Sequence, residues 1–311
     1  MLFYALIAQN IVMLIVIAWI AFSSVKSRKN SIISIAGAAT LLAGLSASGV
    51  WFYPPTYGLI FYLILFGAAS FYRLRRSPKA EMMHFTKTST ALTATSIVAG
   101  GLLLWQGMSG RTPPPGHYID LTSPFRPDQG FCVLSGGSSL LLNLHYLLAG
   151  SEASRYEMHA LDITRKNRFG FRTMPSYSIN PKPRDPAHYA IFGQPVFAPC
   201  SGEVLSMEND QPDVLAGDEY RVRSGANLVN IKCHNAIVVL AHLKQGSVLV
   251  EQGQNVNIGD QIGLVGNSGN TEEPHLHIHA QSLPDPSKPE AYSSPIPIRF
   301  NGKFLARGNC L

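Results

Sequence analysis

The first third of the chain contains four long apolar stretches, and these constrain its fold more than any other feature. Each has close to the roughly 20 residues that cross the 30 Å hydrocarbon core of a bilayer. They hold almost no ionisable residue, which favours anchoring over transport, and Gln9 and Asn10 are candidate inter-helix hydrogen-bond partners. The stretches are 2–25, 32–52, 57–72 and 90–108. We therefore predict a multi-pass α-helical membrane segment of about four transmembrane helices over residues 1–110.

Basic residues mark the predicted orientation of this segment. Residues 1–110 hold 8 Lys and Arg against one acidic residue, whereas 111–311 hold 17 against 18. The basic residues gather after the first and third apolar stretches, at 26–29 and 73–87. Because cytoplasmic loops are enriched in Lys and Arg, everything after Met108 is expected outside the cytoplasm, on the periplasmic side of a bacterial inner membrane. No basic residue precedes the first stretch, so we expect it to be retained rather than cleaved. The remainder has no basic excess, so no nucleic-acid partner is expected.

The remainder of the chain has the pattern of an all-β domain. Pro113-Pro114-Pro115 predicts a semi-rigid linker over residues 111–130. From 131 to 311, short β-branched and aromatic runs alternate with Gly, Asn and Pro, and Asn301-Gly302 indicates a two-residue hairpin. Expected strands include 194–198, 202–207, 227–233, 236–243, 247–250 and 261–265. A long polar segment, 164–189, is expected to be functional or mobile, and its role stays open.

Four cysteines lie in this outer part, at positions 132, 200, 233 and 310. Their spacing fits no compact zinc knuckle, so we expect disulfides or buried thiols. Four cysteines allow three pairings, and the sequence does not choose among them.

The strongest local signal is Pro274-His275-Leu276-His277-Ile278-His279. Successive side chains of a strand alternate between faces, so the three histidines project from one side. One histidine on a strand is most often structural, but three at this spacing favour metal binding or catalysis. Two further units are His242, at the end of an apolar run, and His159, three residues before Asp162.

Together these motifs resemble the lysostaphin-like (LytM) zinc metallopeptidases. Four signatures occur in that family's order, over about residues 130–282, and the resemblance does not extend to the membrane segment. They are Gly193–Val204, Ala241–Leu243, Val256–Gly266, and Gly269-Asn270 with Pro274–His277.

The resemblance implies a lysostaphin/LytM-type β-sandwich built on a duplicated hybrid motif. It also implies Zn²⁺ as the cofactor, with Asp162 and His277 as metal ligands and His242 and His275 as the catalytic pair. The implied activity is that of a membrane-anchored hydrolase, a zinc endopeptidase acting on peptide bonds of peptidoglycan cross-links or stems. Peptidoglycan peptides and the lipid bilayer are the expected partners, and envelope protein partners stay open.

The first metal ligand departs from the family pattern. H-x-G-x-D would place a histidine at 158, but this chain has Met158. Residues three apart on a strand face opposite sides, so His159 would point away from Asp162 unless a β-bulge intervenes. Some family members have an upstream Asn-x-His, which corresponds here to His145. We therefore prefer His145 as the first ligand and keep His159 as the alternative.

Two other functions compete with this one. A catalytically inactive LytM-type regulator of other cell-wall hydrolases would have the same fold, but such domains usually lack the ligands. The turn-rich repeats at 252–256 and 259–263 resemble those of biotinyl or lipoyl carriers, but no suitable lysine lies between them. The histidines and Asp162 thus favour the enzyme.

Overall fold

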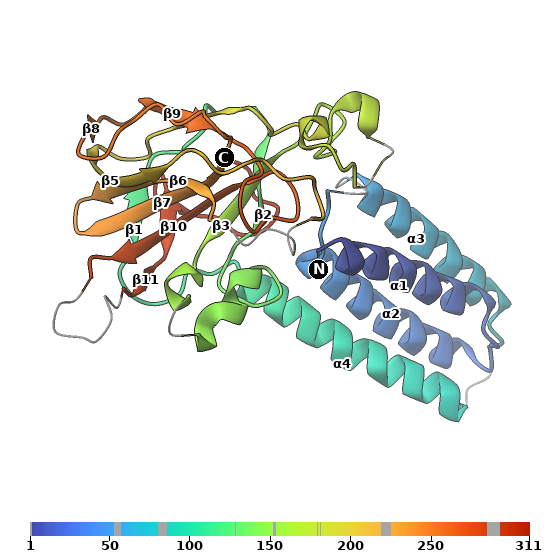
Figure 1. Ribbon diagram of the computed structural model, residues 1–311. Coiled ribbons are helices and arrows are strands. Elements are labelled where there is room, and N and C mark those ends of the chain that lie inside the picture. The colour runs from blue at the N-terminus through green and yellow to red at the C-terminus, as the bar shows by residue number, and fades with distance from the viewer. Residues whose placement is uncertain are drawn as a thin grey trace. The chain divides into compact units, whose positions relative to one another are not determined.

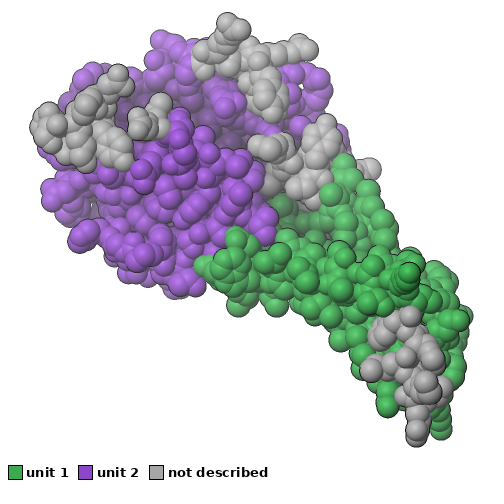
Figure 2. Space-filling model, turned by 90° about the horizontal axis from the view of Figure 1, so that it is seen from below, with its two compact units in different colours: residues 1–109 green, residues 110–311 purple. Residues whose placement is uncertain are grey.

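A computed structural model of the chain describes residues 2–52, 57–79, 86–127, 129–151, 154–178, 180, 182–218, 225–284 and 293–311. The chain divides into two compact units, residues 1–109 and 110–311 (Figure 2). The loop at 53–56, which has no Lys or Arg, lies outside the described residues, as does part of the basic segment at 73–87.

Unit 1 is helical, and each of its helices falls on one of the predicted apolar stretches (Figure 1). The described helices are α1 (Leu2–Phe22), α2 (Arg28–Ser48), α3 (Gly58–Arg76) and α4 (Lys87–Ser109). In the described residues, α2, α3 and α4 are long and apolar enough to cross a membrane, and the part of α1 whose side chains the structure describes, Ile7–Phe22, is apolar but shorter. Four crossings therefore remain a prediction.

Close packing of α2 against α4 depends on glycine. A β-carbon at Gly100 would overlap the backbone of Leu41, and one at Gly44 would overlap the carbonyl group of Gly100. The hydroxyl groups of Ser34 and Thr93 also meet, at 3.4 Å. Small residues and paired hydroxyls are the usual means by which helices associate where apolar burial gives no driving force.

Of the two amide residues of α1, Asn10 contacts another helix, as expected, whereas Gln9 contacts the segment that follows α2. The buried Gln9 accepts from the backbone N–H of Val50 at 2.9 Å and donates to the carbonyl of Val50 at 2.8 Å. Tyr62 of α3 donates to Asn10 at 2.6 Å. Each contact joins α1 to another part of the unit.

Unit 2 is mostly β, and its described strands form three sheets (Figure 1). The large sheet has the order β2-β3-β10-β7-β6-β5-β8, with β11 beside β10, while β4-β9 and β1-β12-β13 are small sheets. The strands are β1 (Ile119–Leu121), β2 (Phe131–Ser135), β3 (Leu161–Arg165), β4 (Pro195–Phe197), β5 (Gly202–Glu208), β6 (Asn227–Cys233), β7 (Ala236–Leu243), β8 (Asn255–Val256), β9 (Gln261–Leu264), β10 (Leu276–Ser282), β11 (Pro295–Ile296), β12 (Ile298–Phe300) and β13 (Lys303–Phe304). Short 3-10 helices are η1 (Leu144–Gly150), η2 (Arg155–Glu157), η3 (Pro175–Tyr177) and η4 (Pro186–His188).

The main core of unit 2 lies on one face of the large sheet. Leu276 and Ile278 of β10 and Leu240 of β7 are fully buried in it, together with Val196 of β4 and Ile298 of β12. Burying each such side chain contributes about 1.5–3 kcal/mol. Because successive side chains of β10 point to opposite faces of the sheet, its histidines lie on the face away from this core, as the sequence predicted.

Two disulfides resolve the pairing that the sequence left open. Cys132 pairs with Cys310, and Cys200 pairs with Cys233. The first links edge strand β2 to the C-terminal segment, and the second links the residues before β5 to the end of β6. All four cysteines are thereby unavailable as metal ligands.

The linker prediction, residues 111–130, is wrong in its second half. Ile119 of β1 pairs with Ile298 in a parallel ladder, and Phe125 stacks on Phe131 at 3.9 Å between ring centroids. The sequence pattern missed this because β1 is only three residues long and pairs with a strand far along the chain. The predicted strand at 247–250 is likewise not one: Val248 and Val250 enter the core from a loop.

Candidate metal centre and active site

Strand register brings the first two site residues together. His277 of β10 pairs directly with Asp162 of β3 in the antiparallel ladder. Opposed residues of such a pair project from the same face, and here Nδ1 of His277 lies 3.1 Å from Oδ1 of Asp162.

His145 reaches the same carboxylate from a 3-10 helix rather than from a strand. Its Nε2 lies 3.0 Å from both oxygens of Asp162. The buried Asn143 begins η1 by accepting from the N–H of His145 at 3.1 Å, and it donates to the carbonyl of Ala160, just before β3, also at 3.1 Å. The Asn-x-His pattern therefore has a physical role, because the asparagine fastens the helix start to the strand that carries Asp162.

His159 lies elsewhere. It occupies the turn before β3, and its Nδ1 is 3.3 Å from the hydroxyl of Tyr146. Burial lowers the pKa of His159 to about 4. The described structure thus brings His145, and not His159, to Asp162.

Among the described residues, two sets of three side chains could hold a metal ion. One is His145, Asp162 and His277, and the other is His242, His275 and His277; within each set the ligand atoms lie within 4.8 Å of one another. Tetrahedral zinc bonds of about 2.0–2.2 Å place ligand atoms about 3.3–3.6 Å apart. The first set comes close to this spacing, since its imidazole nitrogens lie 3.0 and 3.1 Å from the carboxylate.

His242 and His275 flank this set, and each is held through Nδ1 by a backbone carbonyl. Nδ1 of His242 donates to the carbonyl of Ser268 at 2.8 Å, and Nδ1 of His275 donates to the carbonyl of Glu273 at 2.8 Å. Their rings lie 4.7 Å apart. With Nδ1 occupied, each ring has only Nε2 left to serve the site, and that of His275 lies 3.4 Å from Asp162.

Backbone strain helps to aim His242. Its φ is 62°, a left-handed conformation that costs a non-glycine residue about 1–3 kcal/mol. Such strain persists where the surrounding structure over-determines it, and here the ladder between β6 and β7 is also irregular between Asn227 and Leu228.

The pKa of each group in the cluster depends on the charges of its neighbours. Burial raises the pKa of Asp162, but His145 and His275 outweigh it and hold the pKa well below its usual range. Burial lowers the pKa of His145, yet Asp162 more than compensates and the pKa is raised. Burial, with His275 and His277 nearby, holds the pKa of His242 well below its usual range. The ionised carboxylate of Asp162 is therefore stabilised by positive charge on the neighbouring imidazoles. A divalent cation would stabilise it in the same way.

A buried ion pair that sequence reasoning missed supports His275. Arg172 contacts Glu273 at 2.7 Å, and both side chains are almost completely buried. The carbonyl of Glu273, which holds His275, also accepts from Thr271 at 2.8 Å. Arg172 lies in the polar segment 164–189, so part of that segment braces the loop before β10. A pairing across 101 residues leaves no local signal in one sequence.

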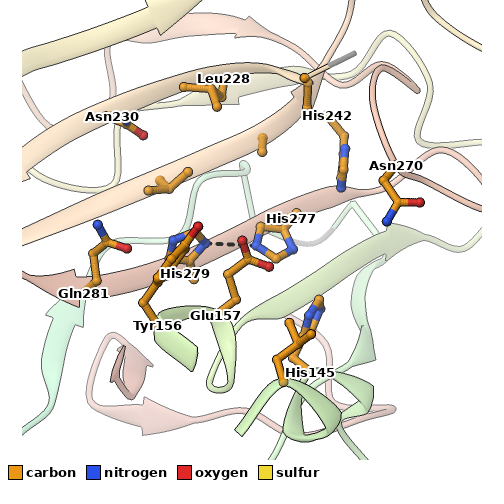
Figure 3. Close-up of a pocket in the computed structure, with 15 residues that line it drawn as sticks. His145, Tyr156, Glu157, Leu228, Asn230, His242, Asn270, His277, His279 and Gln281 are labelled. Carbon is orange, nitrogen blue, oxygen red and sulfur yellow. Dashed lines mark hydrogen bonds between the residues drawn. The ribbon is translucent and has the colours of Figure 1, made fainter. Parts of the chain in front are cut away.

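The cluster opens into a cavity of about 500 Å³ (Figure 3). The floor is apolar, with Leu228 of β6 and Val239 and Ala241 of β7. His145, His242 and His277 lie at one side and come from three different elements (Figure 3). Polar groups converging on one side of an apolar cavity are typical of a binding site.

A comparison with known proteins finds a family match over the part of the chain that contains most of this site. The family model "Peptidase family M23" matches residues 188–289, which include His242, His275 and His277. No curated protein matches the chain. Similar solved structures include a zinc-containing peptidase from Vibrio cholerae, with 22% identity, 35% of this chain and 26% of that chain covered, and a TM-score of 0.24. Lysostaphin from Staphylococcus simulans has 16% identity, coverage of 45% and 42%, and a TM-score of 0.27. The catalytic domain of the prophage-encoded M23 protein EnpA from Enterococcus faecalis, in a mutant form, has 15% identity, coverage of 60% and 94%, and a TM-score of 0.28.

Proposed function

We propose that this chain, whose residues 188–289 form a peptidase family M23 domain, is a membrane-anchored zinc endopeptidase that cleaves peptide bonds of peptidoglycan cross-links or stems. The observation that carries the proposal is the convergence of His145, Asp162 and His277, with ligand atoms within 4.8 Å of one another. Two imidazoles and one carboxylate are a donor set of catalytic zinc sites, which keep a fourth position open.

Nε2 of His145, Nδ1 of His277 and an oxygen of Asp162 would hold the ion. When bound there, zinc supplies Lewis acidity toward water and toward the scissile carbonyl. The residues fit the ion because imidazole nitrogen and carboxylate oxygen are both established zinc donors, and because a cation would neutralise the buried negative charge of Asp162.

His242 and His275 would carry the proton transfers. Each is fixed through Nδ1 by a backbone carbonyl, which leaves Nε2 for the reaction. One ring accepts the proton of the attacking water, and the pair stabilises the developing oxyanion and returns a proton to the leaving amine. Because the two rings are held alike, we assign these roles to the pair.

Membrane anchoring belongs to unit 1 in this proposal. Helices α2, α3 and α4 are apolar enough to span a bilayer. The basic loops of unit 1 favour a cytoplasmic position for those loops and a periplasmic position for unit 2 in a bacterial inner membrane. Two disulfides in unit 2 agree with an oxidising compartment.

The test uses the full chain purified in detergent. We expect about one zinc ion per chain, the usual content of a mononuclear catalytic site, and new amino groups released from purified peptidoglycan. Asp162→Ala should remove both. Zinc bound by the wild-type chain without hydrolysis would favour the regulator over the enzyme, and a chain that binds no zinc would overturn the proposal.

A further inference from the structure

His279 belongs to neither metal set, yet it contacts a residue that belongs to both. It follows His277 by two residues on the same face of β10, and Nε2 of His277 lies 2.9 Å from its Nδ1 (Figure 3). Both rings are almost completely buried. When two buried imidazoles share a hydrogen bond, one ring nitrogen must donate the proton and the other must accept it.

The direction of this hydrogen bond follows from the metal site. A neutral imidazole has one N–H group and one lone pair. Nδ1 of His277 faces Asp162, so a metal bound there would use the lone pair of Nδ1. The proton of His277 then resides on Nε2, and Nδ1 of His279 accepts it. His279 in turn carries its own proton on Nε2.

A second buried group is available to receive that proton. Within the described part of the chain, Nε2 of His279 and Oε1 of Gln281 are both buried without a hydrogen-bond partner. Gln281 is the next residue along the same face of β10. One group is a donor and the other an acceptor, so each supplies what the other lacks. Tyr156 of η2 packs beside His279, with the ring centroids 5.5 Å apart.

We propose that His279, supported by Gln281, is a positioning residue that holds His277 in the tautomer and ring orientation that binds zinc. The inference rests on the proposed zinc site and adds a residue to its support. Without His279, the Nε2–H of His277 would be a buried donor with no acceptor, and the ring would be free to exchange tautomers. Losing such a partner of a metal-binding histidine typically weakens metal affinity about 10–100-fold.

The experiment measures zinc affinity of the full chain in detergent by competition with a chromophoric chelator. His279→Leu should weaken zinc binding about 10–100-fold. His279→Asn should restore affinity to within a few-fold of wild type, because its amide oxygen reaches the place of Nδ1. His279→Gln, whose amide reaches the place of Nε2, should not restore it.

A matched control is His159→Leu, which removes a partly buried histidine outside the metal sets and should leave zinc affinity unchanged. Thermal unfolding of each metal-free variant reports any loss of folding. If the His279→Leu variant unfolds, the inference is tested by the difference in zinc affinity between His279→Asn and His279→Gln. Wild-type affinity in both the leucine and glutamine variants would overturn the inference while leaving the zinc site intact. Failure of the wild-type chain to bind zinc would overturn the proposed function, and this inference with it.

Discussion

The two units bury polar side chains in different ways. In unit 1, buried polar groups form closed pairs, in which each group satisfies the hydrogen bonding of the other. Gln9 both accepts from and donates to Val50, and the hydroxyl groups of Ser34 and Thr93 are paired. In unit 2, His145 and His277 direct ring nitrogens at one carboxylate, that of Asp162. A closed pair needs nothing further, whereas several lone pairs directed at one point are satisfied by protons or by a bound cation. Closed pairs should therefore set stability, and converging groups should set function.

The largest effect is expected where groups converge. Asp162→Ala removes the carboxylate shared by the metal set, so zinc binding and peptidoglycan hydrolysis should both fall below detection. Asp162 lies on the face of β3 opposite the core, so the variant should stay folded. Metal analysis, amine release and thermal unfolding measure the three outcomes. Hydrolysis by a zinc-free preparation would contradict the assignment.

A smaller loss is expected from His242→Ala, which leaves the first metal set complete. Hydrolysis should fall about 10²–10⁴-fold, the range for loss of a general acid or base, with zinc content unchanged. Single-turnover rates on peptidoglycan fragments measure the change. Loss of zinc from this variant would instead favour the set formed by His242, His275 and His277.

The buried ion pair of Arg172 and Glu273 is a closed pair inside unit 2. Arg172→Met leaves the buried carboxylate of Glu273 without its partner, which should cost about 3–5 kcal/mol in the free energy of unfolding. Because the pair lies outside both metal sets, zinc should still bind to the folded variant. Denaturant unfolding and zinc titration are the two measurements, and an unchanged stability would show that the pair is not structural.

The smallest effect is expected in the helical unit. Gly100→Ala places a β-carbon against the backbone of Leu41 and should destabilise unit 1 by about 1–3 kcal/mol, the usual cost of overpacking. Gly101→Ala is the matched control, since nothing lies within 4 Å of its β-carbon. Thermal unfolding in detergent compares the two. Equal stability would mean that α2 and α4 do not pack through Gly100, and zinc affinity should be the same in both.

Local pattern was sufficient for several features. The lengths of the apolar stretches located α1 to α4, because a run of about 20 apolar residues has few other stable forms. Period two along β10 placed Leu276 and Ile278 in the core and the histidines on the opposite face. Asn301-Gly302 correctly located the turn between β12 and β13.

Contacts between distant residues decided the rest. Only the fold shows that His145 approaches Asp162 from a 3-10 helix, that Cys132 pairs with Cys310, and that Arg172 pairs with Glu273. Periodicity states which face a residue occupies, but a partner 17, 101 or 178 residues away depends on strand order and register. The sequence by itself determined which side chains could bind a metal, and the tertiary structure determined which of them meet.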